Sequence, residues 1–155
     1  MREIIKGISF QEYNLTIVRL VTFLSIMGEH HKKSITKDKL ILFDFYLKYP
    51  ELTNDFEKKM DFDTKYSYFH WKPNYRLYST ILADLKSRKL VSCSSENGGY
   101  YITERGNEFV LDMKNTYVDK TKVVSEYINK NIYKLTNKAI TEDIEKILSK
   151  KRGYR

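Results

Sequence analysis

The sequence is poor in the residues that build covalent or unusual backbone scaffolds. Its 155 residues include 1 Cys, 2 Pro and 6 Gly. A single cysteine excludes an internal disulfide, and so few glycines and prolines exclude collagen-like and Pro-rich disordered chains. Because 41% of the residues are hydrophobic and 31% are charged, an ordinary apolar core can form. These numbers predict one domain over residues 1–155.

Long hydrophobic runs and targeting signals are also lacking. The longest apolar stretch, Leu15 to Met27, contains Arg19 and is too short to span a bilayer. The first residues, Met1 to Glu3, do not have the pattern of a signal peptide. The lone Cys93 is compatible with a reducing compartment. We therefore expect no membrane association and a cytoplasmic location.

The chain carries an excess of positive charge. Lys and Arg number 28 against 20 Asp and Glu, which gives a formal net charge of +8. Such an excess attracts polyanions, either nucleic acids or acidic protein surfaces. The excess is spread along the chain, however, and its densest run is the terminal segment 150–155. An AT-rich coding bias would also produce a Lys-, Ile- and Asn-rich chain, so the charge alone is weak support for DNA binding.

Apolar spacing in the first third of the chain predicts two helices. Residues 15–27 place apolar side chains almost all round a helix, which predicts a central and largely buried element. After Gly28, either Ser34 or Thr36 is a suitable cap for a second helix. This second helix includes Leu40 to Leu47 and is stopped by Pro50.

A third helix followed by a hairpin is predicted in the middle of the chain. Pro73 suits the start of this helix, and residues 74–86 have apolar side chains four apart. Residues 90–94 and 100–102 then alternate like two strands around a turn rich in Asn and Gly. Thr103 can cap the helix that follows the hairpin.

The order of these elements indicates a fold. Two further amphipathic helices are expected within residues 118–148. Three helices, a hairpin and another helix occur in this order in winged helix-turn-helix domains. We therefore predict a mainly α fold with a small β-hairpin, a winged helix-turn-helix core over about residues 12–113 and a helical C-terminal extension over about residues 116–150. The alternative is a hairpin in some other α+β domain.

Aromatic residues crowd the segment between the second and third helices. Six of them occur between Phe56 and Trp71, interleaved with acids. Protein interfaces favour Tyr, Trp and Phe, so we interpret this segment as a docking surface, although the rings could equally cap the core. An amphipathic terminal helix is a second candidate surface. The candidate interface residues are Phe62, Tyr66, Tyr68, Phe69, Trp71, Ile144 and Leu148.

Basic and amide side chains on and around the third helix are candidates for nucleic-acid contact. The tip of the hairpin, residues 94–97, is neutral or acidic, which disfavours insertion into the minor groove. We expect weak contacts with phosphates rather than base readout. The candidate nucleic-acid-binding residues are Lys72, Asn74, Arg76, Lys86, Arg88 and Lys89.

Catalytic and metal motifs are not found in the sequence. His30 and His31 are adjacent, so on a helix they point about 100° apart and cannot hold one metal as an i, i+4 pair would. His70 stands alone, and the acids Asp61 and Asp63 lack the Gly and the later Glu of a calcium loop. Gly-rich phosphate loops, nucleophile elbows and Cys pairs are also missing. We therefore predict no catalytic residues, no metal, no cofactor and no enzyme activity.

Two segments resemble a known protein family. They are the string Leu40-Ile41-Leu42-Phe43-Asp44-Phe45-Tyr46-Leu47-Lys48-Tyr49-Pro50-Glu51 and the wing from Leu90-Val91 to Gly106, separated by a divergent aromatic insert. Over about residues 12–110 the chain is similar to the middle component of bacterial ABC three-component systems, of which Lamassu is the best-known example. In that family a winged-helix protein accompanies an SMC- or Rad50-like ABC ATPase and an effector, often a nuclease.

The resemblance implies a function without chemistry of its own. We expect an accessory subunit that links the SMC/Rad50-like ATPase to the effector nuclease in anti-phage or anti-plasmid defence, with non-specific DNA contact within the complex. A winged-helix transcriptional regulator, which would be a homodimer on a palindromic operator, is the first alternative. A protein inhibitor or antitoxin that occludes one toxic enzyme is the second.

Overall fold

The described part of the molecule is mainly helical. The computed structural model describes residues 10–53 and 73–153. Its elements, in chain order, are α1 (Phe10–His30), α2 (Lys37–Lys48), the 3-10 helix η1 (Pro50–Thr53), α4 (Tyr75–Ser87), β1 (Val91–Cys93), β2 (Tyr100–Ile102), α5 (Glu104–Asp112), α6 (Thr116–Asn131) and α7 (Asn137–Gly153). The two strands form one antiparallel sheet. The prediction of a mainly α chain with a small β-hairpin is thus confirmed.

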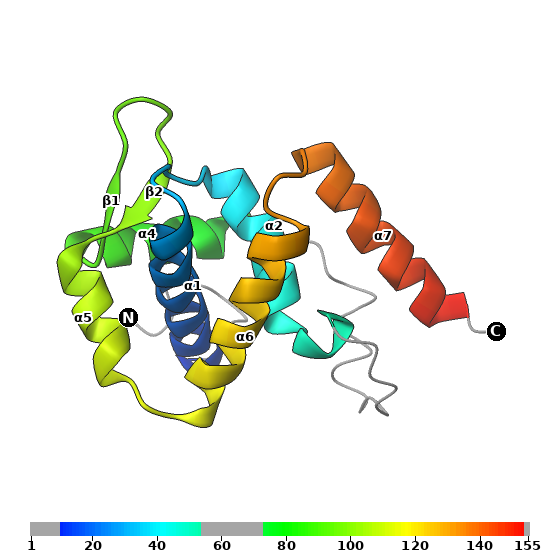
Figure 1. Ribbon diagram of the computed structural model, residues 1–155, viewed down its shortest axis with the longest axis horizontal. Helices are drawn as coiled ribbons and strands as arrows, with labels where there is room; N and C mark the ends of the chain where they lie inside the picture. Colours follow the sequence, from blue (N-terminus) through cyan, green and yellow to red (C-terminus); the bar gives the residue numbers. More distant parts are fainter. Residues whose placement is uncertain (1–9, 54–72, 154–155) are drawn as a thin grey trace.

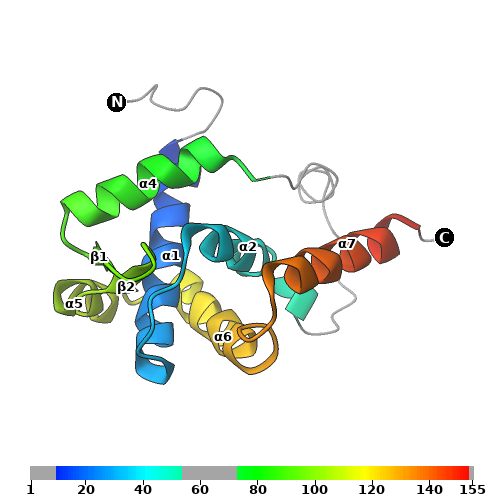
Figure 2. The same ribbon diagram turned by 90° about the horizontal axis from the view of Figure 1, so that it is seen from above.

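Helix α1 is the centre of the fold. It lies between α4 on one side and α6 on the other, while α7 lies along the flank formed by α2 (Figures 1 and 2). The contact between α1 and α6 is the most extensive between any two elements described. Val124 and Ile128 of α6 belong to the same hydrophobic cluster as α1. The first of the helices expected in the C-terminal extension, α6, is therefore part of the main core.

The sequence of α1 explains its central position. All residues from Leu20 to Met27 are buried, because α4, α5, α6 and the hairpin cover different sides of this helix. The predicted helix over 15–27 is confirmed, but it is longer at both ends. Gly28 does not end it, and the last helical residue is His30. An uninterrupted buried helix of this kind buries enough apolar surface to organise a small domain.

Side-chain caps fix where the helices begin. Of the two caps that the sequence allows for α2, Thr36 is the one used, and it accepts a hydrogen bond from the Lys39 amide. Thr103 caps α5 with a 3.0 Å bond from the amide of Gly106, also as predicted. The sequence predicts helical spacing from residue 74, next to Pro73. In the structure α4 begins at Tyr75, and Asn74 caps it by accepting from the Leu77 amide at 3.0 Å. Each cap satisfies an amide that would otherwise lack a partner.

An isolated β-bridge fastens the hairpin to the body. Ile35, just before α2, forms an antiparallel bridge with Tyr100 of β2. The Ile35 amide donates to the Tyr100 carbonyl at 2.9 Å, and the Tyr100 amide donates to the Ile35 carbonyl at 2.8 Å. The turn of the hairpin contains Gly98 at a φ of 70°, which is a backbone conformation that glycine tolerates best. Strand β2 is therefore paired with β1 along one edge and with Ile35 at the other.

Close packing at Gly106 joins α5 to the hairpin. A Cβ atom at this position would lie 2.2 Å from the carbonyl oxygen of Leu90 and 2.6 Å from Cδ1 of Ile102. Such distances are far below van der Waals contact, and backbone cannot move away as a flexible side chain can. A glycine is thus required where α5 crosses the base of the hairpin.

We expect Gly106→Ala to lower the free energy of unfolding by about 1–3 kcal/mol, because the methyl group overpacks the contact with Leu90. In an unhindered helix the same change would stabilise by up to about 1 kcal/mol. Urea denaturation followed by circular dichroism measures the effect. Glu108→Ala, an exposed change in the same helix, is the control and should stay within about 0.5 kcal/mol. A stabilised Gly106→Ala variant would contradict the close contact.

Candidate functional site

A buried ion pair connects the helices around α1. Arg19 of α1 is 2% exposed and Asp44 of α2 is fully buried. The Arg19 Nε atom donates to Asp44 Oδ1 at 2.8 Å and Nη2 donates to Oδ2 at 2.9 Å. Tyr78 of α4 donates to the same Oδ2 at 2.5 Å, and Arg19 Nη1 donates to the hydroxyl of Tyr117 in α6 at 3.1 Å. One polar cluster therefore joins α1, α2, α4 and α6.

The electrostatics of this cluster favour its charged pair. Burial opposes the charge on Arg19, but the neighbouring Asp44 carboxylate outweighs it and holds the pKa of the guanidinium well above its ordinary value. Burial, with the negative charge of Asp44, also raises the pKa of Tyr78, which stays a neutral donor. Arg19 further donates to Thr16 at 3.0 Å. These groups satisfy one another inside the core, so their arrangement is that of a structural network rather than of a reactive site.

The candidate nucleic-acid residues of α4 fall into two sets. Arg76 and Lys86 are exposed on the outer face of the helix. By contrast, Asn74 is used as the cap, and Arg88 makes bonds of 3.0 and 3.2 Å with Asp84. Lys89 is exposed at a φ of 65° just after the helix. The sixth candidate, Lys72, lies outside the described residues.

Asp84 is shared between Arg88 and a second partner. The hydroxyl of Tyr13 in α1 donates to Asp84 Oδ2 at 3.0 Å. Burial and this hydrogen bond raise the pKa of Tyr13 to about 12. Arg88 is therefore part of the contact between α1 and α4, which reduces its availability to an external phosphate.

The candidate interface residues can be located only in part. The five aromatic candidates, Phe62, Tyr66, Tyr68, Phe69 and Trp71, lie outside the described residues. Ile144 and Leu148 are fully buried in the main hydrophobic cluster. Their helix, α7, packs against α2, and the Tyr46 hydroxyl donates to Asp143 Oδ2 at 2.6 Å. The apolar stripe of α7 thus faces the chain's own core in this structure.

Other apolar side chains are exposed that the sequence did not single out. Leu111 of α5 is 68% exposed and Val123 of α6 is 65% exposed. Tyr75 of α4 and Tyr101 of β2 are 54% and 43% exposed. Each of these side chains lies outside the side of its element that faces the core. Apolar spacing placed Val123 on the apolar side of its helix, but the structure exposes it.

The two adjacent histidines join α1 to α6 instead of forming a metal site. The His31 ring stacks on that of Tyr133, with centroids 3.8 Å apart, and its Nε2 lies 2.6 Å from Asn129 Oδ1. His30 Nε2 lies 2.8 Å from Glu126 Oε1. Over residues 10–53 and 73–153, no three His, Cys, Asp or Glu side chains are grouped to hold a metal ion.

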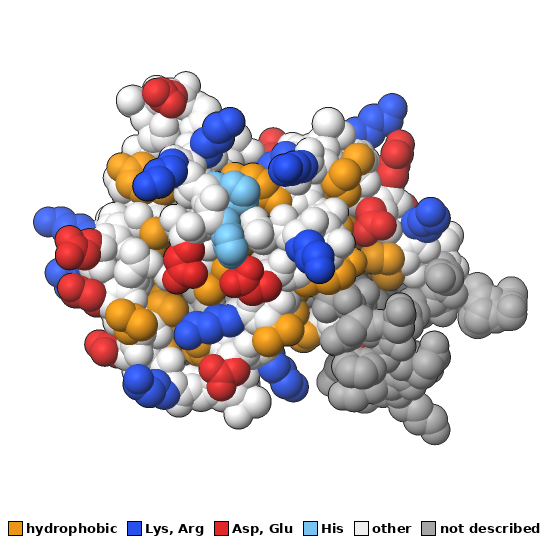
Figure 3. Space-filling model, viewed as in Figure 1, with side chains coloured by type: hydrophobic (Ala, Val, Ile, Leu, Met, Phe, Trp, Pro, Cys, Tyr) orange, Lys and Arg blue, Asp and Glu red, His pale blue; other side chains and the backbone are white. Residues whose placement is uncertain are grey.

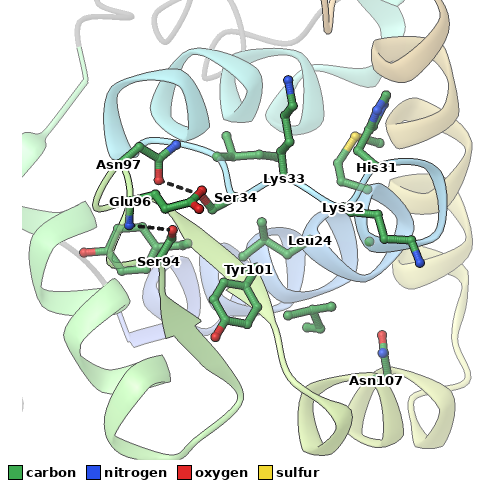
Figure 4. Close-up of a pocket in the computed structure, with 15 residues that line it drawn as sticks. Leu24, His31, Lys32, Lys33, Ser34, Ser94, Glu96, Asn97, Tyr101 and Asn107 are labelled. Atoms are coloured by element: carbon green, nitrogen blue, oxygen red, sulfur yellow. Dashed lines mark hydrogen bonds between the residues drawn. The ribbon is translucent and has the colours of Figure 1, made fainter.

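A hollow opens beside the contact between the end of α1 and the hairpin. This hairpin cavity has a volume of about 540 Å³ and lies between the end of α1, the segment leading into α2, the hairpin and α5 (Figure 4). Leu24 and Tyr101 lie in its middle, with His31 and Lys32 on one side. On the other side the hydroxyl of Ser34 donates to Asn97 at 2.6 Å. A smaller histidine cavity of about 330 Å³ lies between the ends of α1 and α6.

The architecture defines a helical protein in which a buried ion pair joins the helices and two hollows lie at the end of α1. A family model described as "ABC-three component (ABC-3C) system Middle Component 2" matches residues 16–153. The chain therefore belongs to this family, and the name implies further components in the same system. No curated protein and no solved structure gives a significant match. Among the described residues, no helix is both long and apolar enough to cross a bilayer.

We expect Asp44→Asn to lower the free energy of unfolding by about 3–5 kcal/mol, because it leaves the buried Arg19 guanidinium without its counter-charge. The melting temperature and a urea titration measure the loss. Asp38→Asn removes an exposed acid from the same helix and should change stability by no more than about 0.5 kcal/mol. Equal stabilities of the two variants would contradict the structural role of the ion pair.

Proposed function

We propose that the chain is a non-catalytic accessory subunit that links an SMC/Rad50-like ABC ATPase to an effector nuclease in a Lamassu-type defence complex against phages or plasmids. The family match over residues 16–153 carries the proposal. The match extends from α1 into α7, so we assign the accessory role to the helical body as a whole and not to one segment of it.

The buried charged groups are occupied by contacts within the fold, which supports a non-catalytic role. Arg19 and Asp44 are consumed by contacts with each other and with Tyr78 and Tyr117. Neither of the two charged side chains lines the hairpin cavity or the histidine cavity. In an active site the perturbed titratable groups would instead face a cleft that admits a substrate.

We further infer that the core is a winged helix-turn-helix. Helices α1, α2 and α4 precede the hairpin in the order such a domain requires. The bridge between Ile35 and Tyr100 ties the hairpin to the segment that enters α2, as expected for a hairpin that acts as a wing. In this arrangement α4 is the third helix and presents Arg76 and Lys86 outward.

A DNA-binding transcriptional regulator is a second candidate function. The observation that favours it is the basic outer face of α4, beside which Lys37 of α2 donates to Ser79. The tip of the hairpin argues against base readout, since it carries the acid Glu96 and its Asn97 is bonded to Ser34. We therefore rank this function below the accessory role.

The accessory role predicts capture of two partners by one chain. When the tagged chain is co-expressed with the ATPase and the effector of its own system, both should co-purify with it. The isolated chain should show no ATP hydrolysis and no DNA cleavage with divalent metals. Activity that follows the chain through every column and is lost in a point variant of this chain would contradict the proposal.

The aromatic insert is the surface that we propose for partner docking. Trp71→Ala should weaken binding to the ATPase or the effector by about 1–4 kcal/mol, which reduces co-purification. The melting temperature of the isolated chain should stay nearly unchanged. Ile144→Ala is the contrasting variant, because truncating this fully buried side chain should cost about 2–5 kcal/mol of stability. A large melting change for Trp71→Ala with intact partner capture would show that the aromatic rings belong to the core.

A further inference from the structure

Two cavities adjoin each other at the C-terminal end of α1. The hairpin cavity lies on the side of β2, and the histidine cavity lies on the side of α6. His31 lines both of them. The two hollows together provide a surface that none of the predicted interface or nucleic-acid residues occupies.

Positive charge is concentrated around these hollows. Lys32 and Lys33 line the hairpin cavity, and Lys130 and Lys134 line the histidine cavity. We call these four residues the lysine face. Within the described part of the chain, Glu96 is the one acid that lines either cavity. Figure 3 shows Lys and Arg side chains above and beside the histidines, with acidic side chains below them.

Opposing charges near the lysine face are smaller in sum. Helices α1 and α6 both end here, and each carbonyl end carries roughly half a negative charge. Glu126 lies at the margin and is occupied by His30 at 2.8 Å. With Glu96 of the cavity lining, these contributions come to about three negative charges against four ammonium groups. All four lysine side chains are exposed. The face therefore attracts a polyanion, and the attraction should fall as salt increases.

The larger cavity offers more than charge. Its middle contains Leu24 and the ring of Tyr101, which remains 43% exposed. Asn97 and Asn107 add amide groups to the lining. An exposed aromatic ring in a basic groove is a platform on which an unpaired base can stack. The bases of a duplex are paired and stacked inside the helix, so they cannot reach such a ring.

We propose that this surface binds a single-stranded nucleic-acid segment, with its phosphates on the lysine face and an unpaired base against Tyr101 in the hairpin cavity. The surface is separate from the outer face of α4, because none of the residues that line either cavity belongs to that helix. Helices α4 and α6 also lie on different sides of α1 (Figure 2). An acidic peptide would satisfy the lysines but would leave the aromatic ring without a stacking partner.

Fluorescence anisotropy of the full chain with a labelled oligodeoxythymidine of about 15 nucleotides tests the charge contribution. The double variant Lys33→Gln, Lys130→Gln should bind about tenfold more weakly and should reduce the slope of log Kd against log salt by about 1.4. The double variant Lys120→Gln, Lys146→Gln is the matched control, since it removes the same charge from exposed positions of α6 and α7 that line neither cavity. Equal losses in the two variants would overturn the proposal.

The stacking contribution has its own pair of variants. Tyr101→Leu should weaken binding of the oligodeoxythymidine about fivefold or more, whereas Tyr75→Leu, which removes an exposed ring from α4, should leave it unchanged. A hairpin duplex of the same length should bind more weakly than the single strand. Equal or tighter binding of the duplex, or equal competition by a polyglutamate peptide, would overturn the proposal.

Partner capture separates this inference from the accessory role. The lysine-face variant should still co-purify with the ATPase and the effector. If it loses that capture while oligonucleotide binding is unchanged, the lysine face is a protein interface and the nucleic-acid proposal is wrong.

Discussion

The buried pair of Arg19 and Asp44 is the constraint on which the arrangement of the helices depends. Removing two charges from water is unfavourable by several kcal/mol per ion unless every donor and acceptor finds a partner. Here the partners come from four helices, with Tyr78 and Tyr117 completing the cluster. Apolar packing is non-directional and would tolerate a shifted helix, whereas a bidentate ion pair tolerates little displacement. We infer that this cluster selects one mutual placement of α1, α2, α4 and α6.

That placement also decides which surfaces are left for partners. Because α1 is enclosed, α4 and α6 each expose only the side that faces away from it. The outer side of α4 carries Arg76 and Lys86, and the end of α6 carries Lys130. These charges therefore project in different directions, although the sequence suggests only a diffuse excess of positive charge. Burial of α7 against α2 similarly removes Ile144 from the set of exposed apolar positions.

Local signals in the sequence were sufficient for most of the fold. The apolar spacing over residues 74–86 predicted the buried side of α4, which contains Leu77, Ile81 and Leu85. The cap at Thr103 was also predicted, and Thr36 was one of the two caps expected for α2. Such features depend on neighbours within one or two turns. Their interactions can therefore be deduced from a short stretch of chain.

Long-range pairings could not be deduced in the same way. In the sequence Arg19 is only a charge within an apolar helix, and its partner Asp44 is 25 residues away. The bridge from Ile35 to Tyr100 and the stacking of His31 on Tyr133 also depend on how separate elements meet. The hollows at the end of α1 form where those separate elements meet, so the sequence could not indicate the candidate site proposed there.

The same network bears on whether the two faces of the molecule influence each other. Coupling between distant sites requires an element with two arrangements that both ligands bias. Helix α1 is shared by both faces, but Arg19 holds it to Asp44 of α2 and Tyr117 of α6, and all three guanidinium nitrogens donate hydrogen bonds in this one arrangement. Tyr78 of α4 joins the same cluster through Asp44. Shifting α6 would break the bond to Tyr117 and leave a buried donor unsatisfied, which is unfavourable by about 1–3 kcal/mol or more. The structure therefore favours two faces that act independently, so that a strand bound near α6 and a partner bound beyond α4 would be held together by one rigid body rather than by a conformational signal.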